Sequence, residues 1–480
     1  MSCSTTSLFS ASGFPVRFSP ILSIVLAFSL AGTFVLAKRP IRYGDISREL
    51  RELLGQHGIH ETDFNNYVRA INQNTAERET EGEYDHLVNF VLQSMRFTKK
   101  PRVEPALSAS ELVGNLSPEE KSRYLSDKLY LPPIERFPLP ALQRFRDFIK
   151  AVKDRTADER LSYLRDFIQK DREQSESPLH RLYAQYARSM RFLYQKEFAS
   201  RDISDPRNAV SFVSSLYQDR GHSTDTQIEA NFAIYIALAA LKSETPSLRL
   251  DNVLIVGPGL DFAPRTDLID VINPQSYQPF MVADALLALK LSASETLRIH
   301  CVDINDRVIG YLHGFPKRRP RRLSIISGVA DNERHPLSSE YRGYFRELGK
   351  SIGVVSSLDN LPEEFDHHLK KSLAISREVA ESITVDKLNI IAERYDPSPQ
   401  YDLVIVTNVF AYFNANELLL SLVNIQSMIR PGGYLIHNEA RQMLFPFARS
   451  LGLPMVQSRT LLIAASKQAP LYDSVWVHRK

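Results

Sequence analysis

The stretch Leu254-Ile-Val-Gly-Pro-Gly-Leu-Asp261 indicates the fold of the second half of the chain. Its apolar run is typical of a buried strand, and Gly257 and Gly259 follow where that strand would end. Glycine at such a position adopts a left-handed conformation easily and lets a ligand approach the backbone closely. A tight turn without a ligand explains the same two residues, because a lone Gly-x-Gly is a weak signal.

From Leu250 onward, short apolar runs alternate with helical stretches. Buried strands that alternate with helices predict an α/β fold with a parallel, doubly wound, Rossmann-like sheet. The last two apolar runs predict strands that pair antiparallel at the edge of this sheet. The predicted strands lie in residues 253–257, 297–304, 382–390, 401–410, 432–439, 452–466 and 472–480.

Two known nucleotide-binding patterns do not fit the glycine turn. Phe262 occupies the third glycine position of a dinucleotide fingerprint, and no Gly-Lys-Ser/Thr of a phosphate-binding loop follows. The second strand, however, ends in Asp303, and an acid at that position can accept both hydroxyls of a ribose. Alternatively, Asp303 or Asn305 caps the helix that begins near Asp306. A ribose without a pyrophosphate is typical of a different nucleoside cofactor.

In this region the sequence resembles the class I S-adenosylmethionine-dependent methyltransferases. Five segments match in order, over roughly residues 252–440: VLIVGPGLD, IHCVDIN, ITVDKLNI, YDLVIVTNVFAYF and MIRPGGYLIHNE. The latter half most resembles the catalytic domain of the CheR-type glutamate methyltransferases. The counterparts of that family's motifs are Leu388-Asn389, Thr407-Asn408-Val409 with Tyr412-Phe413, Arg430-Pro431-Gly432-Gly433, and His437-Asn438-Glu439.

The resemblance implies S-adenosyl-L-methionine as the cofactor and no metal. The implied cofactor-binding residues are Gly257 and Gly259 under the methionine and ribose, Asp261 near the amino group, Asp303 at the ribose hydroxyls, and Asn389 with the Leu388 backbone at the adenine. Asn408 and Tyr412 would face the transferred methyl and the substrate. Methyl transfer is an in-line displacement, so these residues would act mainly by positioning.

The chain also departs from the family pattern. Gly259 and Asp303 are 44 positions apart, about twice the usual interval of roughly 20. Residues 261–280 therefore form an insertion, from which Tyr277 and Gln278 can reach the acceptor. Residues 322–382 are expected to hold the third strand, in Leu-Ser-Ile-Ile-Ser-Gly-Val, and an additional helix. Thr407 replaces the arginine of the CheR-type family, so chemoreceptor glutamates are not predicted as the substrate.

The resemblance divides the chain into three parts. Residues 1–45 form an N-terminal hydrophobic segment, residues 46–242 a helical region, and residues 243–480 the Rossmann-like S-adenosylmethionine-binding domain. The helical region has no clear counterpart in the family. Just before the first strand, His222, Ser223 and Thr224 either close over the cofactor or cap a helix that starts at Asp225.

Residues 21–37 are apolar and uncharged, with Arg17 before them and Lys38, Arg39 and Arg42 after them. About 17 apolar residues are the lower limit for a membrane-spanning helix. As an anchor, this segment would keep the soluble domain in the cytoplasm, because the following residues are basic. As a signal peptide, with small residues at Val35 and Ala37, it would export the domain. A third reading is an extension from an upstream start at Met1.

The remaining features indicate little chemistry of their own. A net charge of +3 does not predict nucleic-acid binding, and Cys3 and Cys301 exclude a disulfide framework. His367 and His368, read in a helical context, lack further ligands for a metal. A basic cluster binds RNA, acidic lipid or an acidic substrate, or is a solvated loop. It comprises Lys317, Arg318, Arg319, Arg321 and Arg322.

The sequence therefore predicts a methyltransferase with an unidentified acceptor, either a protein carboxylate or a small molecule. The alternative is a catalytically silent methyltransferase-like binding protein, membrane-attached or exported. This alternative gains weight if the domain is exported, since S-adenosylmethionine is not expected outside the cytoplasm. A nicotinamide-dependent oxidoreductase is disfavoured by Phe262 and by the lack of a recognisable substrate domain.

Overall fold

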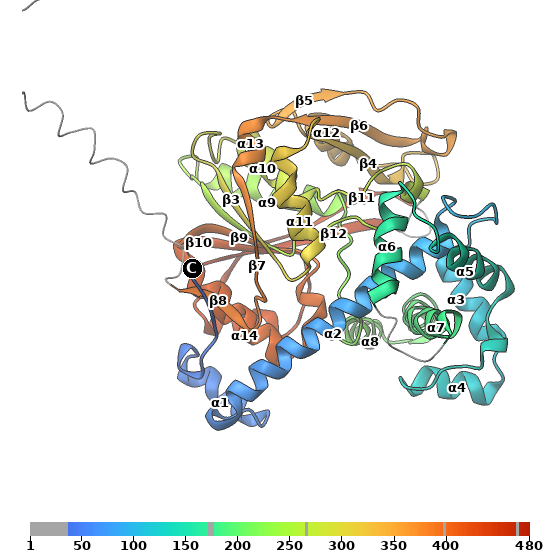
Figure 1. Ribbon diagram of the computed structural model, residues 1–480. Helices are drawn as coiled ribbons and strands as arrows, with labels where there is room; N and C mark the ends of the chain where they lie inside the picture. Colours follow the sequence, from blue (N-terminus) through green and yellow to red (C-terminus); the bar gives the residue numbers. More distant parts are fainter. Residues whose placement is uncertain (1–36, 171–176, 265–266, 397–399, 467–469) are drawn as a thin grey trace, which may run out of the picture.

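The stretch that ends in the glycine turn forms a central strand of a seven-stranded sheet in the computed structural model (Figure 1). The structure describes residues 37–170, 177–264, 267–396, 400–466 and 470–480. The sheet order is β11-β12-β10-β9-β2-β3-β7. Its strands are β2 (Asn252–Val256), β3 (Arg298–Asp303), β7 (Ile383–Lys387), β9 (Tyr401–Val406), β10 (Ile429–His437), β11 (Met455–Ala464) and β12 (Leu471–Arg479).

The sheet confirms the predicted doubly wound α/β fold. Neighbouring strands from β7 through β10 run parallel, and β12 pairs antiparallel with both β10 and β11. The predicted edge hairpin is therefore also confirmed. The chain enters at β2 and winds first toward β3 and β7, then crosses to β9 on the other side. The switch point between these two directions, where such sheets bind ligands, is at the carboxyl end of β2.

Both faces of the sheet are covered, because successive residues of each strand point to opposite sides. Val253 and Ile255 face a core with helices α9 (Glu229–Glu244), α10 and α11, whereas Leu254 and Val256 face a core with α1 (Arg48–Gln56), α2 (Glu61–Gln93) and α14. The helices of this domain are α10 (Gln278–Ala288), α11 (Asp306–Gly314), α13 (Arg377–Glu381), α14 (Ala415–Met428) and α15 (Leu444–Ser450).

The predicted helical region is observed as helices between Arg48 and Glu244. They are α1 (Arg48–Gln56), α2 (Glu61–Gln93), α3 (Pro105–Gly114), α4 (Pro118–Ser126), α5 (Leu139–Ala151), α6 (Glu159–Lys170), α7 (Pro178–Glu197), α8 (Pro206–Gln218) and α9 (Glu229–Glu244). Among the described residues, no helix is both long and apolar enough to cross a membrane. The segment 21–37 lies outside the described residues, except for Ala37.

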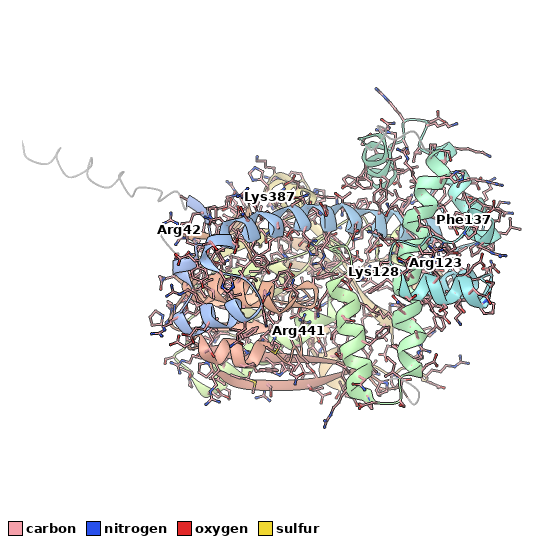
Figure 2. All side chains as sticks on the ribbon, turned by 90° about the horizontal axis from the view of Figure 1, so that it is seen from below. Arg42, Arg123, Lys128, Phe137, Lys387 and Arg441 are labelled. Carbon is pink, nitrogen blue, oxygen red and sulfur yellow. The ribbon has the colours of Figure 1, made fainter. Side chains whose placement is uncertain are left out.

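Helix α2 joins the two parts of the molecule. Its 33 residues span about 50 Å, and Figure 2 shows it running along the molecule from the end near Arg42 toward the end near Phe137. Phe64, Val68 and Ile71 of its first half pack into the core below the sheet. Leu87 and Phe90 of its second half pack among α3, α5 and α7. The two parts therefore share one continuous helix, whose middle turns lie beside the sheet.

Two short strands that were not predicted from the sequence form a separate two-stranded sheet. Strand β1 (Ala37–Pro40) pairs antiparallel with β8 (Glu393–Asp396). Arg39 and Arg394 both bind the carboxylate of Asp45, at 2.7 and 3.0 Å. The residues that directly follow the hydrophobic segment are thus fastened to the sheet domain.

Residues 322–382 contain the expected additional helix, but their strand does not belong to the main sheet. Their apolar run forms β4 (Arg322–Ala330), which joins β5 (Gly353–Ser356) and β6 (His368–Ile375) in a separate antiparallel sheet, order β4-β6-β5, beside α12 (Ser339–Glu347). The third strand of the main sheet is instead β7. The expected helical context of His367 and His368 is also wrong, because His368 begins strand β6 and its ring contacts the carbonyl oxygen of Ser327.

Candidate functional site

Both glycines of the turn are required by the local geometry. Gly257 and Gly259 have φ values of 66° and 73°, a region that disfavours residues with a side chain. A Cβ at Gly257 would lie 2.6 Å from the Val409 side chain, and one at Gly259 would lie 2.7 Å from the Thr224 carbonyl oxygen. The turn is therefore held between the segment that follows β9 and the segment that precedes α9.

A cavity opens at this turn, at the switch point of the sheet. It encloses about 930 Å³ of space, including its mouth. Its floor consists of residues at the ends of β2, β3, β7 and β9, and its walls come from α2 and from residues 222–227. The predicted site residues that line it are Gly257, Gly259, Asp303, Leu388, Asn389, Asn408 and Tyr412.

Asp261 is the predicted site residue that the structure does not bring to the cavity. It is absent from the lining and is buried, with the Tyr277 hydroxyl 3.5 Å from its carboxylate. Burial, together with the charge of Asp225, raises its pKa well above the usual value. The inserted residues 261–277 draw this side chain away from the glycine turn, since the Asp261 N–H donates to the Gln275 carbonyl.

Asp303 lies where a ribose-binding acid is expected. Its carboxylate is buried at the cavity floor, and one oxygen accepts the Asn305 N–H at 2.9 Å. Burial raises its pKa to about 6, although backbone N–H groups, including that of Gly259, lower it again. The alternative role as a helix cap belongs to Asn305, whose side chain accepts the N–H groups of Arg307 and Val308 at the start of α11.

The two asparagines expected at the adenine and the methyl group are both bonded within the protein. The Asn389 amide donates to Asn72 and Thr75 of α2, at 2.8 and 3.2 Å. Asn408 has a left-handed φ of 58° and is bonded to Asn438 through its backbone N–H and its side-chain oxygen. Asn389 thus fixes α2 over the cavity, and Asn438 holds Asn408 in a strained conformation at the cavity rim.

A buried carboxylate supports the turn that carries Tyr412. Glu439 lies behind residues 409–411, and neither of its oxygens makes a hydrogen bond of ordinary geometry within the described part of the chain. Burial raises its pKa to about 8, partly offset by the N–H groups of Val409 and Phe410. Arg441 donates to the carbonyl oxygen of Phe410 at 2.7 Å. Together these residues back the wall that Tyr412 presents to the cavity.

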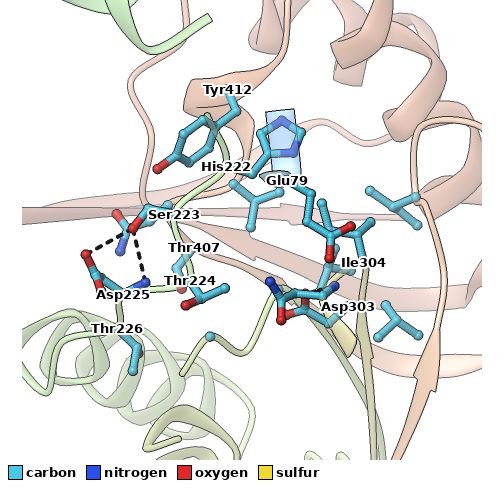
Figure 3. A pocket seen from close by; sticks show the side chains of 18 of the residues that line it. Glu79, His222, Ser223, Thr224, Asp225, Thr226, Asp303, Ile304, Thr407 and Tyr412 are labelled. Atoms are coloured by element: carbon cyan, nitrogen blue, oxygen red, sulfur yellow. Dashed lines mark hydrogen bonds between the residues drawn. The ribbon is translucent and has the colours of Figure 1, made fainter. Parts of the chain in front are cut away.

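The aromatic wall of the cavity pairs Tyr412 with His222. Their ring centroids are 5.4 Å apart and nearly perpendicular, and Figure 3 shows the two rings next to each other. The backbone N–H of His222 donates to the backbone carbonyl oxygen of Arg78 in α2 at 2.8 Å. Of the two readings of residues 222–224, the structure supports closure over the cavity, because α9 begins only at Glu229.

The glycine pair Gly82 and Gly221 brings His222 to the cavity. A Cβ on Gly82 would overlap the His222 carbonyl oxygen, and a Cβ on Gly221 would overlap the Gly82 backbone. Nearby, Arg307 of α11 donates to Glu83 of α2 at 2.7 Å. Close backbone contact and a buried ion pair therefore hold the helical region against the cavity.

Sequence reasoning missed the cavity residues of α2, Thr75 and Glu79. They lie on a polar stretch of the helix, where no motif distinguishes a ligand-facing side chain from a solvated one. Burial raises the pKa of Glu79 to about 7 against the opposing charge of Lys387, with smaller contributions from the carboxylates of Asp306, Glu83 and Asp303. Of the two inserted residues expected near the acceptor, Gln278 lines the cavity and donates to Thr407 at 2.6 Å, whereas Tyr277 is buried behind it.

The structure shows no candidate metal centre. Over the described residues, no group of three or more His, Cys, Asp or Glu side chains is arranged to hold an ion. The basic cluster Lys317–Arg322 lies between α11 and β4, away from the cavity lining.

No protein-family model matches the chain, and a search of curated proteins finds no match. Solved structures of methyltransferases are similar to it. N-methyltransferase NodS from Bradyrhizobium japonicum, in complex with S-adenosyl-L-homocysteine, is 14% identical over 52% of this chain and 85% of that chain, with a TM-score of 0.24. Precorrin-6y C5,15-methyltransferase from Geobacter metallireducens is 11% identical over 52% and 87%, with a TM-score of 0.25.

A third match is magnesium protoporphyrin IX methyltransferase from Synechocystis with bound S-adenosylmethionine, 10% identical over 52% of this chain and 81% of that chain, with a TM-score of 0.25. Because these TM-scores are low, the class of the fold rests on the strand order and the function on the cavity. The strand order defines a Rossmann-like α/β protein with its cavity at the switch point.

Proposed function

We propose that this protein is an S-adenosylmethionine-dependent methyltransferase. The observation that carries the proposal is the meeting of Gly257, Gly259 and Asp303 in one cavity at the switch point of the sheet. The buried Asp303 carboxylate is suited to accept the hydroxyls of a ribose, which would add two donors to the backbone N–H groups that it already accepts. Bound S-adenosylmethionine would supply a methyl group activated by its sulfonium charge.

A dinucleotide is a poorer fit to the same cavity. In a dinucleotide site, the glycine turn leads directly into a helix whose N-terminus binds the pyrophosphate. Here the chain runs from Gly259 through the insertion, and the next α-helix, α10, begins only at Gln278. Phe262, at the third glycine position, is buried against Arg307, whose guanidinium carbon lies 3.9 Å from the ring centroid. In residues 260–264, the described stretch that directly follows the turn, no helix begins whose N-terminus could hold a pyrophosphate.

Each residue of the cavity would contact a different part of the bound cofactor or of the acceptor. Asp303 would hold the ribose, Leu388 and Asn389 would border the adenine, and Asn408 and Tyr412 would border the reacting methyl. The protein would act by aligning the acceptor with the sulfonium carbon and by excluding water. The acceptor is a small molecule or a protein side chain.

Calorimetric titration of S-adenosylmethionine into the full chain tests this proposal. Asp303→Asn should weaken binding about 10- to 100-fold, because it removes a charged hydrogen-bond acceptor from a buried site. Asp306→Asn is the matched control, since Asp306 is exposed and lies three residues further along. Binding should also weaken below about pH 6, where Asp303 becomes protonated. If the folded protein binds neither S-adenosylmethionine nor S-adenosylhomocysteine, the proposal is refuted. The alternative, a catalytically silent methyltransferase-like binding protein, would then be supported.

We further propose that residues 21–37 attach the protein to a membrane with the sheet domain in the cytoplasm, where the cofactor is expected. The uncharged segment and the basic residues after it support this placement. Fractionation tests it: the full chain should sediment with membranes, and a chain that begins at Ala37 should not. Recovery of a shortened protein outside the cell would instead support cleavage and export.

A further inference from the structure

The ionisable carboxyl groups dominate the charge that the described residues present to the cavity. These are Glu79, Asp225 and Asp303, and no lysine or arginine within the described ranges lines the cavity. Figure 3 shows Asp225 and Asp303 on different sides of it. An anionic acceptor would therefore meet a lining whose ionised side chains are carboxylates. The cations that act on them, Lys387 on Glu79 and Arg307 on Asp303, lie outside the lining and would be farther from the acceptor.

The guanidinium groups close to the cavity make their hydrogen bonds and ion pairs with groups outside its lining. Arg78 donates to the carbonyl oxygens of Arg220 and Tyr217, at 2.9 and 3.2 Å. Arg441 binds the Phe410 carbonyl, and Arg307 pairs with Glu83. These cations fix the backbone and the helical region, and none of them is among the residues that line the cavity.

His222 provides a second, independent observation. It lines the cavity beside Tyr412, and both of its ring nitrogens are buried without a hydrogen-bond partner in the described part of the chain. Burial and the charge of Arg78 lower its pKa to about 3, so the imidazole is neutral. A neutral imidazole offers one N–H and one lone pair, and buried polar groups of this kind normally find partners.

We propose that the methyl acceptor is a hydroxyl or an uncharged amine rather than a carboxylate, and that His222 accepts its hydrogen. This inference rests on the proposed methyltransferase function. A lone pair of the acceptor oxygen or nitrogen forms the new bond to the methyl carbon, and the electron pair of the broken sulfur–carbon bond returns to sulfur. The acceptor's proton passes to the free lone pair of His222 and then to solvent.

A weakly basic imidazole is sufficient for this step. The acceptor heteroatom gains positive charge as its bond to the methyl group forms, so its proton becomes strongly acidic during the transfer. A carboxylate has no proton to lose, so it could accept the His222 N–H but would leave the lone pair of the other ring nitrogen without a donor. The perpendicular contact with Tyr412 and the backbone bond to Arg78 fix the ring at the cavity wall.

Three probes with one carbon skeleton test the charge preference: phenethyl alcohol, phenethylamine and phenylacetate. Each is titrated calorimetrically into the full chain saturated with S-adenosylhomocysteine. The alcohol should bind about tenfold more tightly than phenylacetate, a difference expected from one unscreened like-charge contact. The amine, which is an ammonium ion near neutral pH, should bind at least as tightly as the alcohol, because the carboxylates attract it. Asp225→Asn should narrow this gap, whereas Asp359→Asn, at an exposed position in a loop, should leave it unchanged. Equal or tighter binding of phenylacetate would overturn the inference.

The role of His222 is tested by two substitutions. His222→Phe keeps an aromatic ring against Tyr412 but removes both nitrogens, and it should weaken phenethyl alcohol binding about three- to tenfold with S-adenosylhomocysteine binding unchanged. His222→Gln, which keeps a hydrogen-bond acceptor, should restore part of the loss. Wild-type alcohol binding by His222→Phe would refute the role of the imidazole. Failure of S-adenosylhomocysteine to bind would refute the proposed function itself, which keeps the two outcomes separate.

Discussion

Glu439 is a carboxylate that the fold keeps buried behind the Tyr412 turn, and its ionisation opposes folding. Its pKa rises from 4.5 in the unfolded chain to about 8 in the folded protein. Because the folded pKa is the higher one, the folded state holds the proton more strongly. The stabilising contribution is complete below about pH 4.5 and is lost as the pH rises toward about 8.

Glu439→Gln should therefore remove a pH dependence from stability. The free energy of unfolding of the wild type should fall, relative to the variant, by up to about 4 kcal/mol between about pH 5 and pH 8. Chemical denaturation at both pH values measures this difference. Glu363→Gln, at an exposed glutamate, should show no such trend. Parallel stability curves for the wild type and Glu439→Gln would contradict a raised pKa of the buried Glu439 carboxyl group.

Single residues also show what the sequence could and could not predict about the site. Gly257, Gly259 and Asp303 are predictable, because the ends of adjacent parallel strands meet at one edge of a sheet. Thr75 and Glu79 are not, since a polar helix position looks the same whether it faces water or a ligand. Asp261 was misplaced because the sequence does not show that the insertion turns this side chain toward Tyr277.

At the scale of elements, the crossing of α2 with residues 221–222 depends on two glycines. Gly82→Ala should destabilise the protein by about 1–3 kcal/mol, since the new methyl group overlaps the His222 carbonyl. It should also weaken S-adenosylmethionine binding, because Thr224, whose carbonyl oxygen accepts the Leu260 N–H beside the glycine turn, would move away from the cavity. Gly114→Ala in α3 is the control, as nothing lies within 4 Å of its added Cβ. Thermal melts and calorimetry measure both effects.

Strand β1 is a second element with a measurable role. A chain that begins at Ala37 should unfold at the same denaturant concentration as the full chain. A chain that begins at Ser47 loses β1 and the buried side chains of Ile41 and Ile46, and it should be less stable by about 3–6 kcal/mol. Equal stability of the two shortened chains would show that β1 contributes nothing to the sheet domain.

A strand of the main sheet could be predicted where its apolar residues fit the strand period and not the helix period. Strand β6 of the smaller sheet is a case in which both periods fit. In residues 368–375, Leu369 and Leu373 are four apart, which fits a helix. Leu369, Leu373 and Ile375 also share one face of a strand, interrupted by Lys371. Local pattern could not decide between them. Pairing with β4 and β5, far away in the sequence, favours the strand. The sheet to which β4 belongs was also not predictable, because its pairing partner β6 is far away in the sequence.

At the scale of the whole molecule, the helical region and the sheet domain do not have separate interiors. α1 and the first half of α2 share a core with β2, β9 and β10. Phe262, Ala263 and Ile269 of the insertion share a core with the helices of the N-terminal region. Parts that share cores are expected to unfold together.

Scanning calorimetry should accordingly show one cooperative transition. S-adenosylmethionine at about 100 times its dissociation constant should raise the free energy of unfolding by about 2.7 kcal/mol and shift that whole transition. Two resolved transitions, with only the second one moved by the cofactor, would mean that the helical region is an independent unit.

The position of α2 at the cavity wall has a consequence for synthesis of the protein. During translation, Thr75 and Glu79 leave the ribosome long before Asp303, and Tyr412 follows later still. A nascent chain therefore cannot assemble the pocket until nearly all of it has emerged. Occupancy of the pocket would then report that translation has been completed, and truncated products would remain empty.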